Sequence, residues 1–113
     1  MKIYHNPRCR KSRETLTLLK ENGIDPEIIL YLNQPPDRKE LEQIIQRLGI
    51  RPQELIRKGE KIYKENFKGK IMDDSEWIDI MIKYPKLIER PIVLKEDQAV
   101  IGRPPEKVLD LIA

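Results

Sequence analysis

The stretch "YHNPRCRKSRET" near the start of the chain holds its single cysteine, Cys9, and its single histidine, His5. Cys9 stands among four cationic residues: Arg8, Arg10, Lys11 and Arg13. A free thiol has a pKa near 8.5, and the thiolate is the nucleophilic form. Nearby cations and the start of a helix both favour the thiolate. The stretch therefore predicts a reactive Cys9, against the other common fate of a lone cysteine, that of a small buried hydrophobe.

Position 12 is where a C-x-x-C motif would place a second sulfur, and it holds Ser12. A hydroxyl can donate a hydrogen bond to a thiolate but cannot form a disulfide. Any redox cycle at Cys9 must therefore borrow a thiol from another molecule. His5 fits two roles equally well, because a histidine before a loop can relay protons to the thiol or serve as a structural hydrogen-bonding group.

Three arginines stand beside residues that break regular structure. Arg57 lies just before Gly59, Arg90 precedes Pro91, and Arg103 follows Gly102. A guanidinium offers paired hydrogen bonds that suit an oxyanion. Surface charge is the alternative for each, because spacing alone does not show that the three converge.

The elements that must position these residues begin with a β–α–β unit. "MKIYH" reads as a strand, Pro7 breaks it, and a helical pattern runs from Ser12 to a stop at Gly23. The apolar run "EIILYL" (27–32) has the length of a strand that lies buried in a sheet. Such a crossover makes a parallel pair of strands.

A helical segment is expected next. Asp37 and Glu40 form a D-x-x-E helix start, and the helix ends at Gly49. A short helix with Pro52 at its first position follows, and residues 60–72 show no clear pattern. A further helix starts at Asp73 or Asp74 and buries Trp77, Ile78 and Met81 before Pro85.

The last part reads as two strands and a helix. "PIVLK" and "AVIGR" flank a polar turn, which indicates a β-hairpin, and "PPEKVLDLIA" gives a final helix. The whole order predicts an α/β protein with a four-stranded mixed sheet flanked by helices, which is a thioredoxin-like layout. We expect residues 1–113 to form a single domain with a helical insertion at about 34–86.

Composition restricts the function further. The 22 basic residues face 19 acidic ones, for a net charge of +3, so a dedicated nucleic-acid binder is not expected. No apolar run approaches the roughly 18 residues of a membrane span. One cysteine excludes an internal disulfide and a cysteine-based zinc site, and it favours the reducing cytoplasm.

Five motifs in order resemble the glutaredoxin-coupled arsenate reductase family, which includes Spx-like and YffB-like proteins. They are "IYHNPRCRKSRETL", "ILYLNQPPDRKELEQII", "LIRKGE", "ERPIVL" and "GRPPEKVLDLI". The resemblance implies a thioredoxin-like fold with a helical insertion and a cis proline at Pro91. It also implies that Cys9 is the catalytic nucleophile, that His5 assists it, and that Arg57 stabilises the oxyanion intermediate. Arg90 and Arg103 match the two other active-site arginines.

The implied reaction is reduction of arsenate to arsenite. In it the Cys9 thiolate attacks arsenic, glutathione adds to the arsenic as co-substrate, and glutaredoxin reduces the mixed adduct. Ser12 is expected to help bind the arsenate or a similar oxyanion. We expect a monomer without a bound cofactor, a metal or a membrane partner.

Two alternatives stay open. The pair Arg10–Lys11 stands where arsenate reductases of this family have small uncharged residues, and it resembles the YffB-like and Spx-like branches. A YffB-like protein would be a glutathione-dependent thiol reductase without arsenate activity. A Spx-like protein would bind RNA polymerase, but such regulators commonly use a C-x-x-C switch that Ser12 removes.

Overall fold

The computed structural model describes residues 1–112, and the contacts among them form two compact units. The first unit joins Met1–Gln34 to the chain from Arg90 onward, and the second unit is Pro35–Glu89. The second unit is mainly helical and has nearly the bounds of the expected insertion. That the whole chain makes one domain stays a prediction.

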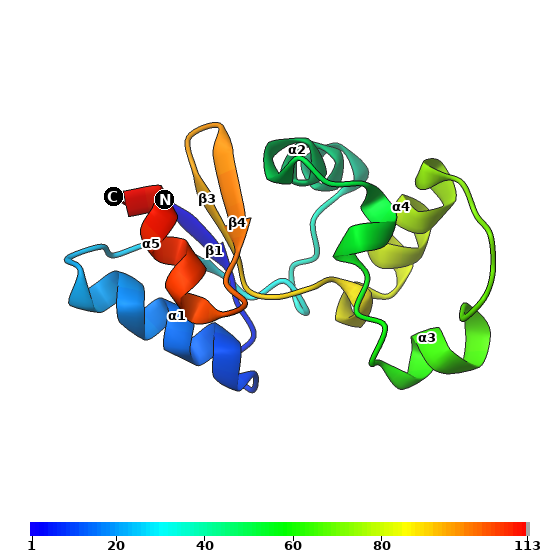
Figure 1. Cartoon of the computed structure of the whole chain (residues 1–113), viewed down its shortest axis with the longest axis horizontal. Helices are drawn as coiled ribbons and strands as arrows, with labels where there is room; N and C mark the ends of the chain where they lie inside the picture. Colours follow the sequence, from blue (N-terminus) through cyan, green and yellow to red (C-terminus); the bar gives the residue numbers. More distant parts are fainter. Residues whose placement is uncertain (113) are drawn as a thin grey trace. The chain divides into compact units, whose positions relative to one another are not determined.

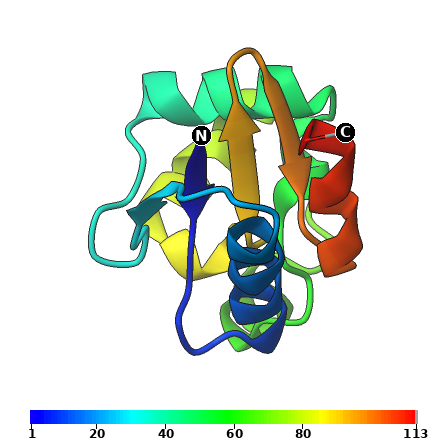
Figure 2. The same cartoon turned by 90° about the vertical axis from the view of Figure 1, so that its left-hand side faces the viewer.

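The first unit is built on a mixed four-stranded sheet, as the sequence predicts. Its strands are β1 (Lys2–Tyr4), β2 (Glu27–Ile29), β3 (Ile92–Lys95) and β4 (Gln98–Ile101), in the order β2-β1-β3-β4. β1 runs parallel to β2 and antiparallel to β3, and β3 forms the expected hairpin with β4. Figure 2 shows the hairpin in orange, with β1 in dark blue beside it.

Helices of the first unit cover one face of this sheet. They are α1 (Arg10–Glu21), the 3₁₀ helix η3 (Pro105–Val108) and α5 (Leu109–Ile112). Ile3 of β1 lies opposite Val93 of β3, so both side chains point to the same face. They form a buried cluster with Leu19, Val108 and Leu111 from the helices. This cluster fixes α1, and therefore the residue at its start, against the sheet (Figure 1).

The strand expected at 27–32 is shorter and less buried than the sequence suggests. β2 ends at Ile29, and the apolar side chains of Ile28, Leu30 and Leu32 are 42%, 37% and 40% exposed. β2 is the end strand in the order of the sheet, and its pairing within the described chain is with β1. The prediction of a buried strand was wrong here because a short apolar run does not show which strand lies at the edge.

The second unit consists of helical elements. They are α2 (Arg38–Leu48), η1 (Pro52–Leu55), α3 (Lys61–Asn66), α4 (Asp74–Lys83) and η2 (Pro85–Leu87). The expected start of α2 is confirmed, because the Asp37 side chain accepts a hydrogen bond from the Glu40 backbone N–H at 2.8 Å. Gly49 ends α2 in the left-handed conformation, with φ of 68°.

Helix α3 lies in the segment that showed no clear pattern. It has six residues, which is too short for a helical repeat of apolar positions to stand out. Its Tyr63 ring lies 6.4 Å from the ring of Trp77 in α4, and Phe67 at its C-terminal end lies 6.5 Å from the same ring. Packing on Trp77 therefore stabilises a helix that the local sequence pattern does not indicate.

Candidate active site

Cys9 is the residue that begins α1. The Arg13 backbone N–H donates to the Cys9 carbonyl at 3.0 Å, so Cys9 is the N-cap and the helix starts at Arg10 rather than at Ser12. The loop before it is tight, since the Cys9 N–H donates to the Asn6 carbonyl at 3.0 Å. Asn6 also accepts from the Arg8 N–H through its side-chain oxygen, at 3.0 Å. This turn leaves the thiol partly exposed beside the first backbone N–H groups of α1.

Two of the three predicted arginines meet the thiol within the first unit. The Arg103 Nη1 atom lies 3.9 Å from the Cys9 Sγ atom, and the hydrogen bond and charge of the Arg90 side chain lower the pKa of the thiol. The same Arg103 Nη1 donates to the Arg90 carbonyl at 3.2 Å. The peptide bonds that follow, Arg90–Pro91 and Arg103–Pro104, are both cis, as expected for Pro91.

Backbone N–H groups at the start of α1 and the side chain of Arg90 lower the pKa of the Cys9 thiol. Burial raises the pKa of the Cys9 thiol, while the Ser12 N–H, the Arg90 hydrogen bond and charge, and the Lys11 N–H lower it. The lowering effects outweigh burial, so the pKa lies below the ordinary value. The thiolate is therefore more abundant near neutral pH than in a free cysteine.

Ser12 and His5 form a buried polar pair behind the loop. The His5 Nδ1 atom lies 2.6 Å from the Ser12 hydroxyl oxygen, which also accepts from the Asn6 N–H at 3.1 Å. The Ser12 hydroxyl thus bonds the loop, and it is the Ser12 backbone N–H that reaches Cys9. The hydroxyl is able to donate to a thiolate, but here it bonds His5 and the Asn6 N–H.

The surroundings of His5 favour the neutral form of its ring. Burial lowers the pKa of His5, and the charges of Arg13 and Lys20 lower it further. A neutral ring has one nitrogen with a proton and one without, so it bonds the Ser12 hydroxyl as donor or acceptor. The bond to Ser12 anchors the loop that leads to Cys9, and a catalytic role for His5 stays a prediction.

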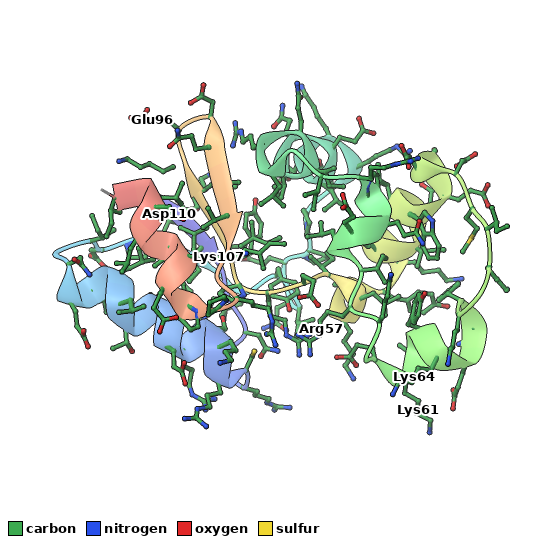
Figure 3. The ribbon with its side chains drawn as sticks, viewed as in Figure 1. Arg57, Lys61, Lys64, Glu96, Lys107 and Asp110 are labelled. Carbon is green, nitrogen blue, oxygen red and sulfur yellow. The ribbon has the colours of Figure 1, made fainter. Side chains whose placement is uncertain are left out.

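Arg57 belongs to the second unit. It follows the bridge between Ile56 and Ile88, and its backbone N–H donates to the Leu87 carbonyl at 2.7 Å. Its Nε atom lies 3.5 Å from the Glu60 Oε1 atom. Figure 3 labels Arg57 to the left of Lys61 and Lys64 of α3. The first unit therefore brings together five of the six predicted site residues: His5, Cys9, Ser12, Arg90 and Arg103.

A hollow borders the loop that carries the thiol. Its volume is about 310 Å³. It is lined by residues 5–8 of this loop and by Leu30, Leu32 and Asn33. Within residues 1–112, no group of three or more His, Cys, Asp or Glu side chains is arranged to hold a metal ion. No helix in that part of the chain is both long and apolar enough to span a membrane.

Sequence reasoning did not assign a role to Asn6. The Asn-Pro pair is a turn signal that could have pointed to Asn6. The start of a helix was expected to favour the thiolate, and the backbone donors that lower the Cys9 pKa are those of Ser12 and Lys11. The helix begins at Arg10, two residues before the expected start at Ser12.

The family model described as the ArsC family matches residues 4–111. The chain belongs to the ArsC family. It is 44% identical to the arsenate reductase of Haemophilus influenzae, over 97% of each chain. It is 50% identical to a protein of Escherichia coli described as the uncharacterized protein YfgD, over 99% of this chain and 96% of that one.

Solved structures of ArsC family proteins share the fold. The arsenate reductase of Vibrio cholerae superposes with a TM-score of 0.92 at 47% identity, over 96% of this chain and 94% of that chain. The chain thus has the thioredoxin-like fold of the ArsC family, with its mixed four-stranded sheet and flanking helices.

Proposed function

We propose that this protein reduces arsenate to arsenite, with Cys9 as the single nucleophile and glutathione and glutaredoxin as the source of electrons. The observation that carries the proposal is the Cys9 sulfur, at the start of α1 and in contact with the guanidinium groups of Arg90 and Arg103. ArsC family relatives with 40–44% identity are named arsenate reductases, which supports the choice of substrate.

The electron balance requires an outside thiol. Reduction of As(V) to As(III) takes two electrons, and two thiols supply them when they join as a disulfide. The chain has one cysteine, so the second thiol belongs to another molecule. Glutathione is that co-substrate in the proposal, and glutaredoxin returns the protein–glutathione product to the free thiol.

The steps follow from the positions of the charges. The Cys9 thiolate displaces an arsenate oxygen, which leaves as water after taking up protons, and an S–As bond forms. Glutathione adds to the arsenic in the same way. Two electrons then pass to arsenic as the two sulfurs join, and arsenite leaves. Arg90 and Arg103 are suited to hold the negative oxygens beside the sulfur through paired hydrogen bonds.

The other residues are given supporting roles. Arg57 is proposed to stabilise the oxyanion intermediate on the basis of the family resemblance. Ser12 supplies its backbone N–H at the thiolate, and His5 holds the loop. In this proposal the protein acts as a cytoplasmic monomer and needs no bound cofactor.

The test is arsenite release by the purified protein supplied with arsenate, glutathione, glutaredoxin and a system that keeps glutathione reduced. We expect turnover that disappears in Cys9→Ser and that stops when glutathione or glutaredoxin is left out. Turnover no higher than that of Cys9→Ser would remove the proposal. Turnover that continues without glutaredoxin would retain the reductase but change its electron donor.

A second candidate is a glutathione-dependent thiol reductase that does not act on arsenate. It is favoured by Arg10 and Lys11, two exposed cations directly after the nucleophile. Arg10 is paired with Glu14 at 2.8 Å, which partly offsets its charge. Reduction of a glutathione mixed disulfide by this protein, without arsenite release, would select this candidate.

A further inference from the structure

A threonine inside α1 bonds across to the segment that follows the hairpin. The Thr15 side chain is fully buried, and its hydroxyl oxygen lies 2.8 Å from the Lys11 carbonyl and 3.3 Å from the Gly102 carbonyl. The first contact is the ordinary local one for a threonine within a helix. The second joins residues 87 positions apart in the sequence. The hydroxyl shares its one proton between the two carbonyls, and the longer contact ties α1 to the residue that follows β4.

Residue 102 must be a glycine because its surroundings leave no room for a Cβ atom. A Cβ atom placed there would lie 2.5 Å from Thr15 Oγ1, 2.9 Å from Pro91 Cγ and 3.0 Å from Thr15 Cγ2. Gly102 is not among the glycines with a positive φ, which within the described residues are Gly23, Gly49 and Gly69. The Gly102 N–H also donates to the Pro91 carbonyl at 2.9 Å. Thr15, Pro91 and Gly102 thus meet in direct contact.

Each member of this contact is linked along the chain to a residue at the thiol. Pro91 follows Arg90, Gly102 precedes Arg103, and Thr15 stands on the helix that Cys9 begins. The contacts of Arg103 with the Cys9 sulfur, at 3.9 Å, and with the Arg90 carbonyl, at 3.2 Å, depend on how these three segments are spaced.

We propose that Thr15 is a positioning residue and that Gly102 leaves the room it needs. Together they hold Arg90 and Arg103 at hydrogen-bonding distance from the Cys9 sulfur. This rests on the proposed function, in which Cys9 is the nucleophile and the two arginines assist it. Thr15 acts through its hydroxyl at Gly102, and it does not itself contact the reacting atoms.

The first test compares Thr15→Val with Thr15→Ser. Valine keeps the shape and loses the hydroxyl, whereas serine keeps the hydroxyl. The readout is the pH dependence of Cys9 alkylation by iodoacetamide, which needs no arsenate. We expect Thr15→Val to move the midpoint to higher pH and to slow alkylation at pH 6 about fivefold, the factor that one ordinary hydrogen bond is worth. Thr15→Ser should stay close to the original profile.

A purely structural role would give a different pattern. Thr15→Val would then lower the melting temperature and leave the alkylation midpoint unchanged, and that result would overturn the proposal. A Thr15→Ser profile displaced as far as that of Thr15→Val would overturn it as well, because the hydroxyl would not be the group that matters.

A second pair of variants keeps the test decisive if Thr15→Val does not fold. Gly102→Ala should raise the midpoint, since its new Cβ atom forces the segments apart. Two of its three short contacts are with Thr15, so Thr15→Ala combined with Gly102→Ala should lower the midpoint below that of Gly102→Ala alone, while the contact with Pro91 Cγ remains. A Gly102→Ala midpoint equal to that of the unmodified protein would overturn the inference.

The same data separate this inference from the proposed function. An unmodified protein that alkylates with the midpoint of an ordinary thiol would overturn both. A lowered midpoint that neither Thr15→Val nor Gly102→Ala changes would overturn the positioning role alone and leave the proposed function standing.

Discussion

The reactivity of Cys9 comes from groups in contact with it rather than from the charge of the whole protein. The net charge is +3, and exposed charges are screened over about 8 Å at physiological salt. Hydrogen bonds from the backbone N–H groups of Ser12 and Lys11 and from the Arg90 side chain lower the Cys9 pKa, and the Arg103 Nη1 atom lies 3.9 Å from the sulfur. Of the cations that surround Cys9 in sequence, none appears among the groups that lower its pKa through a side chain.

Removing a group that contacts the sulfur should therefore raise the Cys9 pKa more than removing an exposed charge nearby in sequence. We expect Arg90→Gln to raise the Cys9 pKa and to slow iodoacetamide alkylation at pH 6 by about tenfold or more, since a hydrogen bond to a charged group contributes roughly 1.5–3 kcal/mol. Arg8→Gln is the matched control, because Arg8 is exposed and lies next to Cys9 in sequence. Equal effects of the two variants on the pH profile would contradict a contact mechanism.

His5 makes folding stability depend on pH. Its pKa is lowered in the folded protein, so the unfolded chain binds the proton more readily. Stability should be fully present above the unfolded pKa of about 6.5 and be lost as the pH falls below it. Urea unfolding at pH 7, 6 and 5 should show a steeper loss for the original protein than for His5→Asn. Parallel curves for the two would refute the prediction.

At the scale of elements, the caps of the second unit make α2 and α4 start where they do. Asp37 and Asp73 each accept a hydrogen bond at 2.8 Å from the N–H three residues ahead. We expect Asp37→Ala to lower the free energy of unfolding by about 0.5–2 kcal/mol in urea titrations. Asp25→Ala removes an exposed carboxylate outside any helix and should change the free energy of unfolding by less than about 0.5 kcal/mol. If Asp37→Ala lowered the free energy of unfolding no more than Asp25→Ala does, the cap would not stabilise α2.

The elements with a complete local signal were predicted well from the sequence. The cap at Asp37, the stop at Gly49 and the hairpin turn before Gln98 each carry their own signal in two to four residues. The elements that were predicted wrongly or missed depend on contacts with residues far away in the sequence. The edge position of β2 is set by the sheet order, and α3 is held by Trp77.

The candidate site divides in the same way. Cys9 and its position before a helix could be read from a few residues. The contacts of Arg90 and Arg103 with the sulfur could not, because 81 and 94 residues separate these arginines from it in sequence. The family resemblance supplied them as candidates, and the structure shows the contacts.

At the scale of the whole molecule, the proposed reaction draws on residues of both compact units. Cys9, Arg90 and Arg103 belong to the first unit, and Arg57 belongs to the second. The groups that set the Cys9 pKa are all in the first unit. Activation of the thiol and stabilisation of the oxyanion should therefore be separable by mutation.

Arg57→Lys is the variant that separates them. Lysine keeps the positive charge but loses the planar pair of donors, so we expect arsenite turnover to fall by tenfold or more. The pH profile of Cys9 alkylation should not change, because lysine keeps the positive charge. Arg51→Lys, which alters an exposed arginine of the same unit, should leave both measurements unchanged. An alkylation profile shifted by Arg57→Lys would show that Arg57 acts on the thiol itself, and undiminished turnover would remove Arg57 from the mechanism.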